Sequence, residues 1–169
     1  MSKSISLSIS IAVLAAVWAF LTVGENAMLA GKALVWAGFI AWGAYFANGG
    51  NSCAAQKTLA SMIFGSVLAV VALNLVNIDP LGLAAYAAPV YIAITVFPLV
   101  AMAGMELLSS VPTNVYGYAA TAAYALQTPN VNATQMDMAN PLVIIIISAV
   151  LGVIFGMISN KLCDMCCKG

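Results

Sequence analysis

Charged side chains are scarce in this sequence, and two residue types are missing altogether. Its 169 residues include five lysines and five acidic residues but no arginine or histidine, so charged residues make up 6% of the chain and the formal net charge is zero. Without a basic surface the chain has nothing to hold a nucleic-acid backbone, and we expect no nucleic-acid partner. Without histidine it lacks the usual general base near neutral pH and the usual partner of a serine or cysteine nucleophile. We therefore expect neither an enzyme nor a cofactor.

Apolar residues take the place of the missing charges. They make up 64% of the chain, against roughly 45–50% in ordinary soluble domains. A helix needs about 20 apolar residues to cross a bilayer, and six runs without lysine, aspartate or glutamate approach that length: residues 5–23, 33–47, 59–76, 83–105, 112–126 and 141–159. Stretches such as 143–147 are apolar on every face, which excludes alternating strands. We predict an all-α membrane protein with six transmembrane helices in one domain, residues 1–169.

The first of these runs, residues 5–23, also resembles a secretion signal, because Lys3 precedes an apolar stretch with small residues after it. We expect it to be retained as a true first helix. Six crossings then place both termini on one side of the membrane.

The lysines predict which side that is. Four of the five fall on the side of the termini: Lys3, Lys57, Lys161 and Lys168. The opposite side carries Lys32 with three acidic residues, Glu25, Asp79 and Asp137. Because positive charge marks the cytoplasmic side, we expect both termini in the cytoplasm.

A weak internal repeat relates residues 1–80 to residues 81–169. Residues 64–70 (FGSVLAV) align with residues 147–153 (ISAVLGV), and the same register pairs Asn77 with Asn160. Each half would contribute three crossings, an odd number, so the copies would form two inverted three-helix repeats. Chance similarity is the alternative explanation, because apolar helices use few residue types.

Short motifs along the chain are similar to one known family. They are WAGF at 36–39, YFA at 45–47, GG at 49–50, LLS at 107–109, VP at 111–112, Gly117, AT at 120–121, LG at 151–152 and IFG at 154–156. In this order and spacing they resemble the YcdZ-like family of small bacterial inner-membrane proteins. The resemblance implies a compact multi-helix protein of the bacterial inner membrane and a domain of unknown function, so it supplies no catalytic residues. The segment 127–138 and the cysteine-rich end depart from the family pattern.

The second and fifth runs are too short to span alone. Fifteen residues of helix rise about 22 Å, less than the roughly 30 Å of hydrocarbon. Irregular backbone must therefore continue them at 48–51 and 109–114, and lipid does not tolerate such backbone unless protein, water or a ligand satisfies it. Ordinary interfacial loops are the alternative, because glycine, asparagine, serine and proline are common in any loop.

These two breaks define a predicted path for a solute. We expect amide and hydroxyl groups of the path to come from Asn48, Asn51, Thr113 and Asn114, and its apolar walls from Trp42, Tyr45 and Tyr116. Glu106 would tune selectivity for cations or couple movement to protons. The alternatives are an aromatic belt at the membrane interface and a glutamate that reaches headgroup water.

Cysteines and small residues carry weaker signals. Four cysteines, Cys53, Cys163, Cys166 and Cys167, are candidate ligands for zinc or copper, but their spacing lacks the two paired Cys-x-x-Cys knuckles of a zinc site. We therefore expect no metal site, and regard reduced or acylated thiols as equally consistent. The Gly- and Ala-rich helix faces predict close packing, within the chain or in a homo-oligomer.

Three features together favour transport: the broken short helices, the inverted repeat and Glu106 as a candidate intramembrane carboxylate. The predicted function is a small-solute channel or secondary transporter for a neutral or weakly cationic polar molecule, since no arginine or histidine is available to pair with an anion. The alternative is a structural or regulatory subunit of a larger membrane complex. A polar cavity at the two breaks would favour transport, and a dry interior would favour the subunit.

Overall fold

The computed structural model describes the chain except for residues 1–2, 25, 132, 135–136 and 167–169. Over the described residues it is helical and contains no strand. Its α-helices are α1 (Lys3–Thr22), α2 (Val35–Ala47), α3 (Ser52–Ile78), α4 (Ala87–Ala101), α5 (Val111–Gln127) and α6 (Pro141–Cys166). Short 3-10 helices flank α4: η1 (Ala84–Tyr86), η2 (Met102–Gly104) and η3 (Glu106–Leu108). The predicted all-α class is confirmed.

Four of these helical segments are long and apolar enough to cross a membrane. By length and composition, and among the described residues, they are Lys3–Thr22, Ser52–Ile78, Ala84–Gly104 and Pro141–Cys166. They are compatible with a membrane location. Helix α2 is apolar but has 13 residues, and α5 has 17. Six crossings therefore stay a prediction that depends on these two short helices.

Several helix boundaries differ from the expected runs. Helix α3 starts at Ser52 rather than at residue 59, because the Asn51 side chain caps it by accepting a hydrogen bond from Ala54 N at 2.8 Å. Helix α6 continues past residue 159 to Cys166, so the described part of the cysteine-rich end is helical. The extra turns of α6 pack on α1, where Ser6 Oγ donates to Cys163 O at 3.4 Å.

The fourth run is not one continuous helix. Pro98 lies inside α4 and cannot donate a backbone hydrogen bond, and the α-helix ends three residues later at Ala101. The 3-10 turns η2 and η3 follow, and α5 begins at Val111 with Pro112 in its first turn. Thr113 and Asn114 therefore lie in the first turn of α5, and the expectation that they belong to irregular backbone was wrong.

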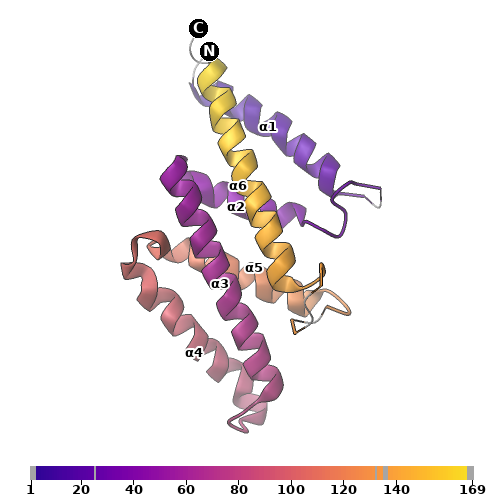
Figure 1. Cartoon of the computed structure of the whole chain (residues 1–169), viewed down its shortest axis with the longest axis vertical. Coiled ribbons are helices and arrows are strands. Elements are labelled where there is room, and N and C mark those ends of the chain that lie inside the picture. The colour runs from indigo at the N-terminus through magenta and orange to yellow at the C-terminus, as the bar shows by residue number, and fades with distance from the viewer. Residues whose placement is uncertain (1–2, 25, 132, 135–136, 167–169) are drawn as a thin grey trace.

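Glycines set how closely the helices approach. A Cβ on Gly65 of α3 would overlap the carbonyl oxygen of Asn114 in α5, and one on Gly117 of α5 would overlap Met62 O. A Cβ on Gly152 of α6 would in the same way overlap Gly38 O in α2. The short helices α5 and α2 thus lie directly on the long helices α3 and α6, across which they run in Figure 1. These glycines are used for packing within the chain.

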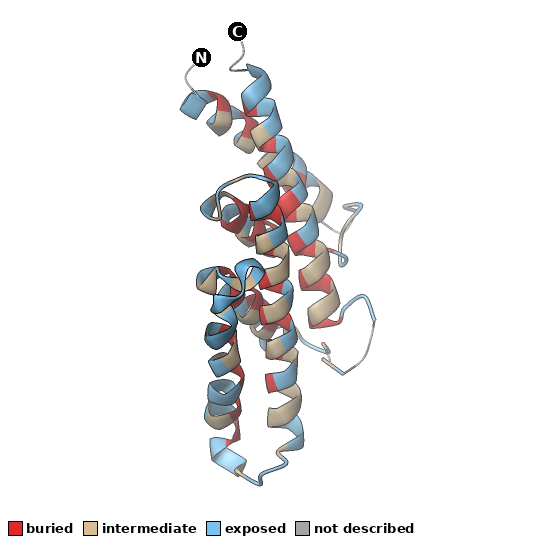
Figure 2. Ribbon diagram, turned by 60° about the vertical axis from the view of Figure 1, so that its left-hand side comes forward, coloured by how far each residue is buried: buried red, intermediate tan, exposed pale blue. Residues whose placement is uncertain are grey.

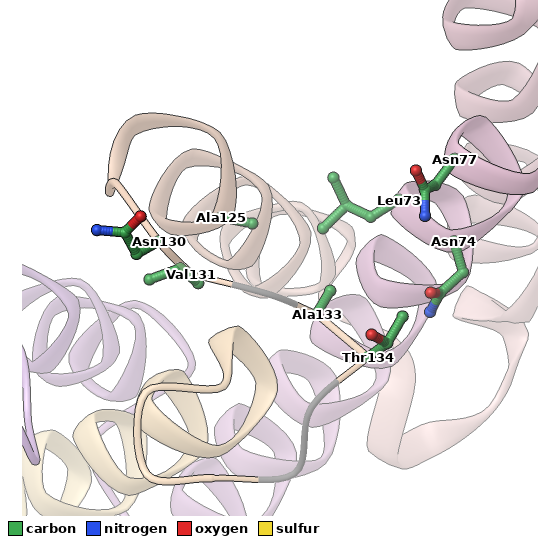
Figure 3. Close-up of a pocket in the computed structure, with 8 residues that line it drawn as sticks. All are labelled: Leu73, Asn74, Asn77, Ala125, Asn130, Val131, Ala133 and Thr134. Carbon is green, nitrogen blue, oxygen red and sulfur yellow. The ribbon is translucent and has the colours of Figure 1, made fainter.

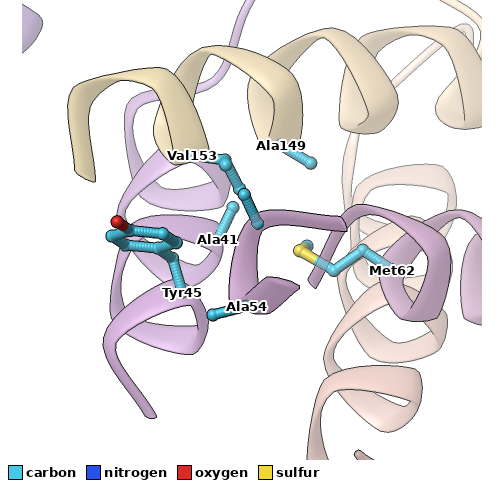
Figure 4. Packing of buried hydrophobic residues seen from close by; sticks show 7 residues of the cluster. Ala41, Tyr45, Ala54, Met62, Ala149 and Val153 are labelled. Atoms are coloured by element: carbon cyan, nitrogen blue, oxygen red, sulfur yellow. The ribbon is translucent and has the colours of Figure 1, made fainter. Parts of the chain in front are cut away.

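Small and polar side chains make up much of the interior, together with a few large ones such as Trp18 and Leu99, while many large apolar side chains face outward. The buried polar residues include Thr58, Ser61, Ser66, Thr121, Ser148 and Ser159, and the exposed apolar ones include Ile5, Ile9, Val13, Phe20, Ile94 and Phe97. Figure 2 shows the buried residues along the contacts between helices. Figure 4 shows one such contact, where Ala41, Ala149 and Val153 pack round Tyr45 and Met62. An apolar exterior suits lipid better than water.

The connections at the ends of α2 and α5 lie on two sides of the molecule, and the α3–α4 connection lies at the bottom of Figures 1 and 2. In both Figure 1 and Figure 2 the α2–α3 and α4–α5 connections lie on the left, and the described parts of the α1–α2 and α5–α6 connections lie on the right. The start of α1 and the end of α6 are neighbours, because Cys163 Sγ donates to Lys3 O at 3.4 Å. The short helices α2 and α5 therefore each run from one side to the other.

Candidate functional site

Three elements meet in a polar cluster at the end of α2. Asn48 follows the last residue of that helix, and the chain reverses through Gly49 and Gly50, whose φ angles of 115° and 64° favour glycine. The Asn48 amide nitrogen Nδ2 donates to Thr58 Oγ1 of α3 at 2.9 Å and to Thr113 Oγ1 of α5 at 3.1 Å. We call this group, with Ser110, the amide–hydroxyl cluster.

The hydroxyl groups of the cluster are shielded. Thr58 and Thr113 are 0% and 1% exposed, and Thr113 Oγ1 lies 2.7 Å from Ser110 Oγ. The cluster contains no titratable group, so it can donate and accept hydrogen bonds without carrying charge. Two of its members, Asn48 and Thr113, were predicted as path residues, and the structure joins them directly. Thr58 and Ser110 were missed, although Thr58 is the last polar residue before the third apolar run begins.

Asn114 holds the connection between α4 and α5. Its side chain is fully buried, and Nδ2 donates to Leu99 O at 3.1 Å and to Leu108 O at 3.0 Å. The oxygen Oδ1 of the same amide is buried and has no hydrogen-bond partner among the described residues, and the same is true of Thr121 Oγ1 about two turns further along the same face of α5. Buried acceptors of this kind are rare and are costly in an apolar interior.

The predicted aromatic walls separate into two places. Trp42 and Tyr45 are each 3% exposed and point to α6, where Trp42 Nε1 donates to Ser159 Oγ at 3.3 Å. Gly156 makes room for both rings. Tyr45 Oη donates to Gly50 O at 2.6 Å, and Asn160 Nδ2 donates to the same carbonyl. Neither ring therefore lies with Tyr116.

Tyr116, Asn51 and Glu106 lie near the surface. Tyr116 is 42% exposed and lines a hollow of about 360 Å³ against α2. Asn51 is exposed and serves as the cap of α3. Glu106 is exposed at the start of η3, four residues before Ser110 of the cluster. The structure thus brings together Asn48, Thr113 and the neighbouring Asn114, but not the other predicted path residues.

The described cysteines differ in exposure and form no metal-binding group. Among the described residues no group of three or more His, Cys, Asp or Glu could hold a metal ion. Cys53 and Cys166 are exposed, whereas Cys163 is buried against α1. Cys167 lies outside the described residues. Reduced or acylated thiols remain the interpretation of the two exposed cysteines.

One carboxylate organises the turn between α3 and α4. Asp79 ends α3 with a left-handed φ of 44°. Its Oδ1 accepts from Leu83 N at 3.0 Å and from Tyr91 Oη at 3.0 Å, and its Oδ2 accepts from Ala84 N at 2.8 Å. The backbone hydrogen bonds from Leu83 and Ala84 lower the pKa of Asp79 below its ordinary value of 3.8.

This lowered pKa predicts how stability depends on pH. The contribution of the Asp79 carboxylate is fully present above pH 3.8 and is lost as the pH falls through the lower pKa of the folded state. We expect the wild type to resist unfolding better than Asp79→Asn at pH 7. The difference in stability between the two should shrink as the pH falls below 3.8. The measurement is the midpoint of SDS-induced unfolding in micelles at pH 7, 5 and 3. A difference that grows on acidification would contradict this account.

One protein-family model matches nearly the whole of the chain. The chain belongs to the family described as "Protein of unknown function (DUF1097)", whose model matches residues 8–164. The match includes α2 to α5 entire, the amide–hydroxyl cluster and Asn114. No curated protein and no solved structure matches the chain. The family description names an uncharacterised domain and assigns no activity.

Proposed function

We propose that the chain is a channel or secondary transporter for a small neutral or weakly cationic polar molecule. The observation that carries the proposal is the amide–hydroxyl cluster, in which Asn48 joins Thr58 and Thr113 where α2, α3 and α5 meet. Uncharged amide and hydroxyl groups can exchange their mutual hydrogen bonds for bonds to a solute with hydroxyl or amine groups. In an otherwise apolar chain, such a group is a functional candidate because polar side chains inside a membrane are costly.

The proposal includes six crossings of a bacterial inner membrane with both termini in the cytoplasm. Two arguments support it. Helices α2 and α5 run between the two sides on which the connections lie (Figure 1), as spans or half-spans would. The lysines Lys3, Lys57 and Lys161 belong to segments on the side of the termini under this topology. The YcdZ-like resemblance fits the same location.

The proposal also includes the inverted repeat, for which packing gives independent support. Helix α5 lies on α3 through Gly65 and Asn114, and α2 lies on α6 through Gly152 and Gly38. An alignment that pairs Gly65 with Gly152 is shifted by four residues from the alignment that pairs 64–70 with 147–153. Four residues are about one helical turn. Helix α4 packs on α3 as α1 packs on α6, which completes the correspondence expected from two inverted halves.

Glu106 has a limited place in the proposal. Its carboxylate is exposed near Ser110 and would attract a weakly cationic solute toward the cluster. A homo-oligomer stays a prediction, and Gly38, Gly65, Gly117 and Gly152 are already used inside the chain.

A structural or regulatory subunit is the second candidate, and one observation favours it. The hydrogen bonds of Asn48 to Thr58 and Thr113 are satisfied within the chain, as in a closed seam between helices. A subunit of this kind would conduct nothing by itself.

Flux into proteoliposomes distinguishes the two. We expect purified protein to accelerate uptake of at least one of glycerol, urea and methylamine, measured by stopped-flow light scattering against empty liposomes. Thr113→Val keeps the shape but removes the hydroxyl, and should lower this flux about tenfold, because a passing solute loses one hydrogen bond. The matched control Thr22→Val changes a threonine of α1 whose hydroxyl bonds its own helix at Trp18 O. No flux above empty liposomes would favour the subunit, and flux insensitive to Thr113→Val would place the path elsewhere.

A further inference from the structure

A polar hollow lies at the opposite end of α3 from the amide–hydroxyl cluster. It has a volume of about 530 Å³, within the range of about 300–1,000 Å³ that is usual for ligand pockets. Its lining comes from the last turns of α3, from the end of α5 and from the α5–α6 connection: Leu73, Asn74, Asn77, Ala125, Asn130, Val131, Ala133 and Thr134. Asn74 lies 16 residues after Thr58 on one helix, a rise of about 24 Å.

The lining offers hydrogen bonds but no charge. Figure 3 shows Asn74 and Asn77 on the α3 side, Thr134 on the neighbouring connection and Leu73 extending toward Ala125 of α5. The Asn74 nitrogen Nδ2 donates to Val70 O at 3.0 Å, and the Asn74 side chain lines the hollow. No lining residue is titratable. The acidic groups nearest in sequence are engaged elsewhere, Asp79 with Leu83 N and Asp137 with Ala139 N.

The facing wall is held by a buried side chain. Asn140 is 1% exposed, and its Nδ2 donates to Ala133 O at 3.2 Å. Its Oδ1 caps α6 by accepting from Leu142 N at 2.9 Å. One buried amide thus ties Ala133, in the wall of the hollow, to the start of α6.

The corresponding place in the other half is filled. When Gly65 is matched with Gly152, Leu73 corresponds to Asn160, which donates to Gly50 O beside Tyr45. Side-chain and backbone groups therefore close the end of α6 against the α2–α3 turn. Among the described residues, the end of α3 carries the hollow in this place. The two ends of the molecule are unequal in a way that a carrier open to one side requires.

We infer that this hollow is a binding site for a small uncharged molecule with several hydroxyl or amide groups, no larger than a monosaccharide. Asn74 and Asn77 donate and accept the hydrogen bonds, and Leu73 supplies an apolar contact. The inference rests on the proposed function, because it makes the hollow the open end of the same path whose closed end is the amide–hydroxyl cluster.

Binding is tested separately from flux. Saturation-transfer NMR on the protein in nanodiscs, with empty nanodiscs as reference, measures binding of urea, glycerol and D-glucose as uncharged probes and of D-gluconate as a charged one. We expect at least one uncharged probe to bind with saturation and D-gluconate to bind at least tenfold more weakly. Asn77→Leu should lower the affinity for that probe about tenfold, the loss expected for one hydrogen bond. Gln56→Leu, the same kind of change at an exposed amide near the start of α3, should not.

The outcomes separate this inference from the proposed function. Binding that depends on Asn77, in a protein without flux, would support the site and overturn transport. Flux that depends on Thr113, with no probe bound or with binding equal in Asn77→Leu and wild type, would support transport and overturn the site. Equal binding of D-glucose and D-gluconate would overturn the uncharged class of ligand.

Discussion

Replacing Gly65 by alanine is expected to separate α3 from α5 and to destabilise the protein more than any other single methyl group we consider. The added Cβ would overlap Asn114 O and would approach Tyr118 N to 2.8 Å. Backbone atoms cannot rotate away as a flexible side chain can, so the helices must move apart. That movement would also break the hydrogen bond from Ser66 Oγ to Gly117 O at 3.2 Å. We expect a loss of about 3 kcal/mol or more in the free energy of unfolding, the upper end of the range for overpacking.

The measurement is SDS-induced unfolding in micelles, followed by circular dichroism. Gly43→Ala is the matched control, because Gly43 lies inside α2 and a Cβ there meets nothing within 4 Å. Alanine is a better helix former than glycine, so this control should be neutral or slightly stabilising. Gly152→Ala should resemble Gly65→Ala, because it overlaps Gly38 O at the corresponding contact of α6 with α2. If Gly65→Ala and Gly43→Ala unfold alike, the close contact of α3 with α5 is not as described.

The all-helical class could be predicted from the sequence, because a long uncharged apolar run in a membrane has few ways other than a helix to satisfy its backbone hydrogen bonds. Helix ends did not follow so well. The start of α3 depends on the Asn51 cap and the end of α6 on its contact with α1, neither of which changes hydropathy. Pro98 gave a visible signal for the end of α4, but a proline can also sit inside a spanning helix.

The polar residues of the candidate site could be predicted from the sequence, because polar groups are unusual in this chain. The direction in which its side chains point could not be predicted. Asn48 and Thr113 were chosen as polar groups beside two breaks, and they do meet. Trp42 and Tyr116 were chosen as aromatic walls of one path, yet Trp42 points to α6 and Tyr116 is exposed. Which face of an apolar helix is covered depends on its glycine contacts, such as Gly156, whose partners the sequence does not reveal.

The hollow at the end of α3 escaped prediction for a related reason. Asn74 and Asn77 read as the polar end of an apolar run, and Asn130 and Thr134 as members of a loop. Neither group suggests a site alone. The loop that carries Asn130 and Thr134 comes to lie beside Asn74 and Asn77 because α5 lies on α3 and returns the chain to its last turns (Figure 3).

Replacing Asn114 by leucine is expected to loosen the connection between α4 and α5. Leucine has the same number and branching of side-chain heavy atoms as asparagine but cannot donate, so Leu99 O and Leu108 O both lose their hydrogen bonds from Nδ2. A buried carbonyl left unpaired costs about 1–3 kcal/mol, and the cost inside a membrane is at the lower end. Removing the unpartnered Oδ1 offsets part of it. We therefore expect a net loss of about 2 kcal/mol in the free energy of unfolding.

Asn77→Leu is the matched control for this loss, because the same substitution at an exposed asparagine removes no described hydrogen bond. The midpoint of SDS-induced unfolding should be well below the wild-type value for Asn114→Leu and equal to it for Asn77→Leu. If transport follows the proposed path, flux per folded molecule should fall in Asn114→Leu as well, since Asn114 neighbours Thr113 and its Oδ1 is an acceptor that a solute hydroxyl can use. Equal unfolding of the two variants would mean that the amide of Asn114 does not hold the end of α4. A stability loss with unchanged flux would confine Asn114 to a structural role, because the acceptor would then lie off the path that Asn48 and Thr113 define.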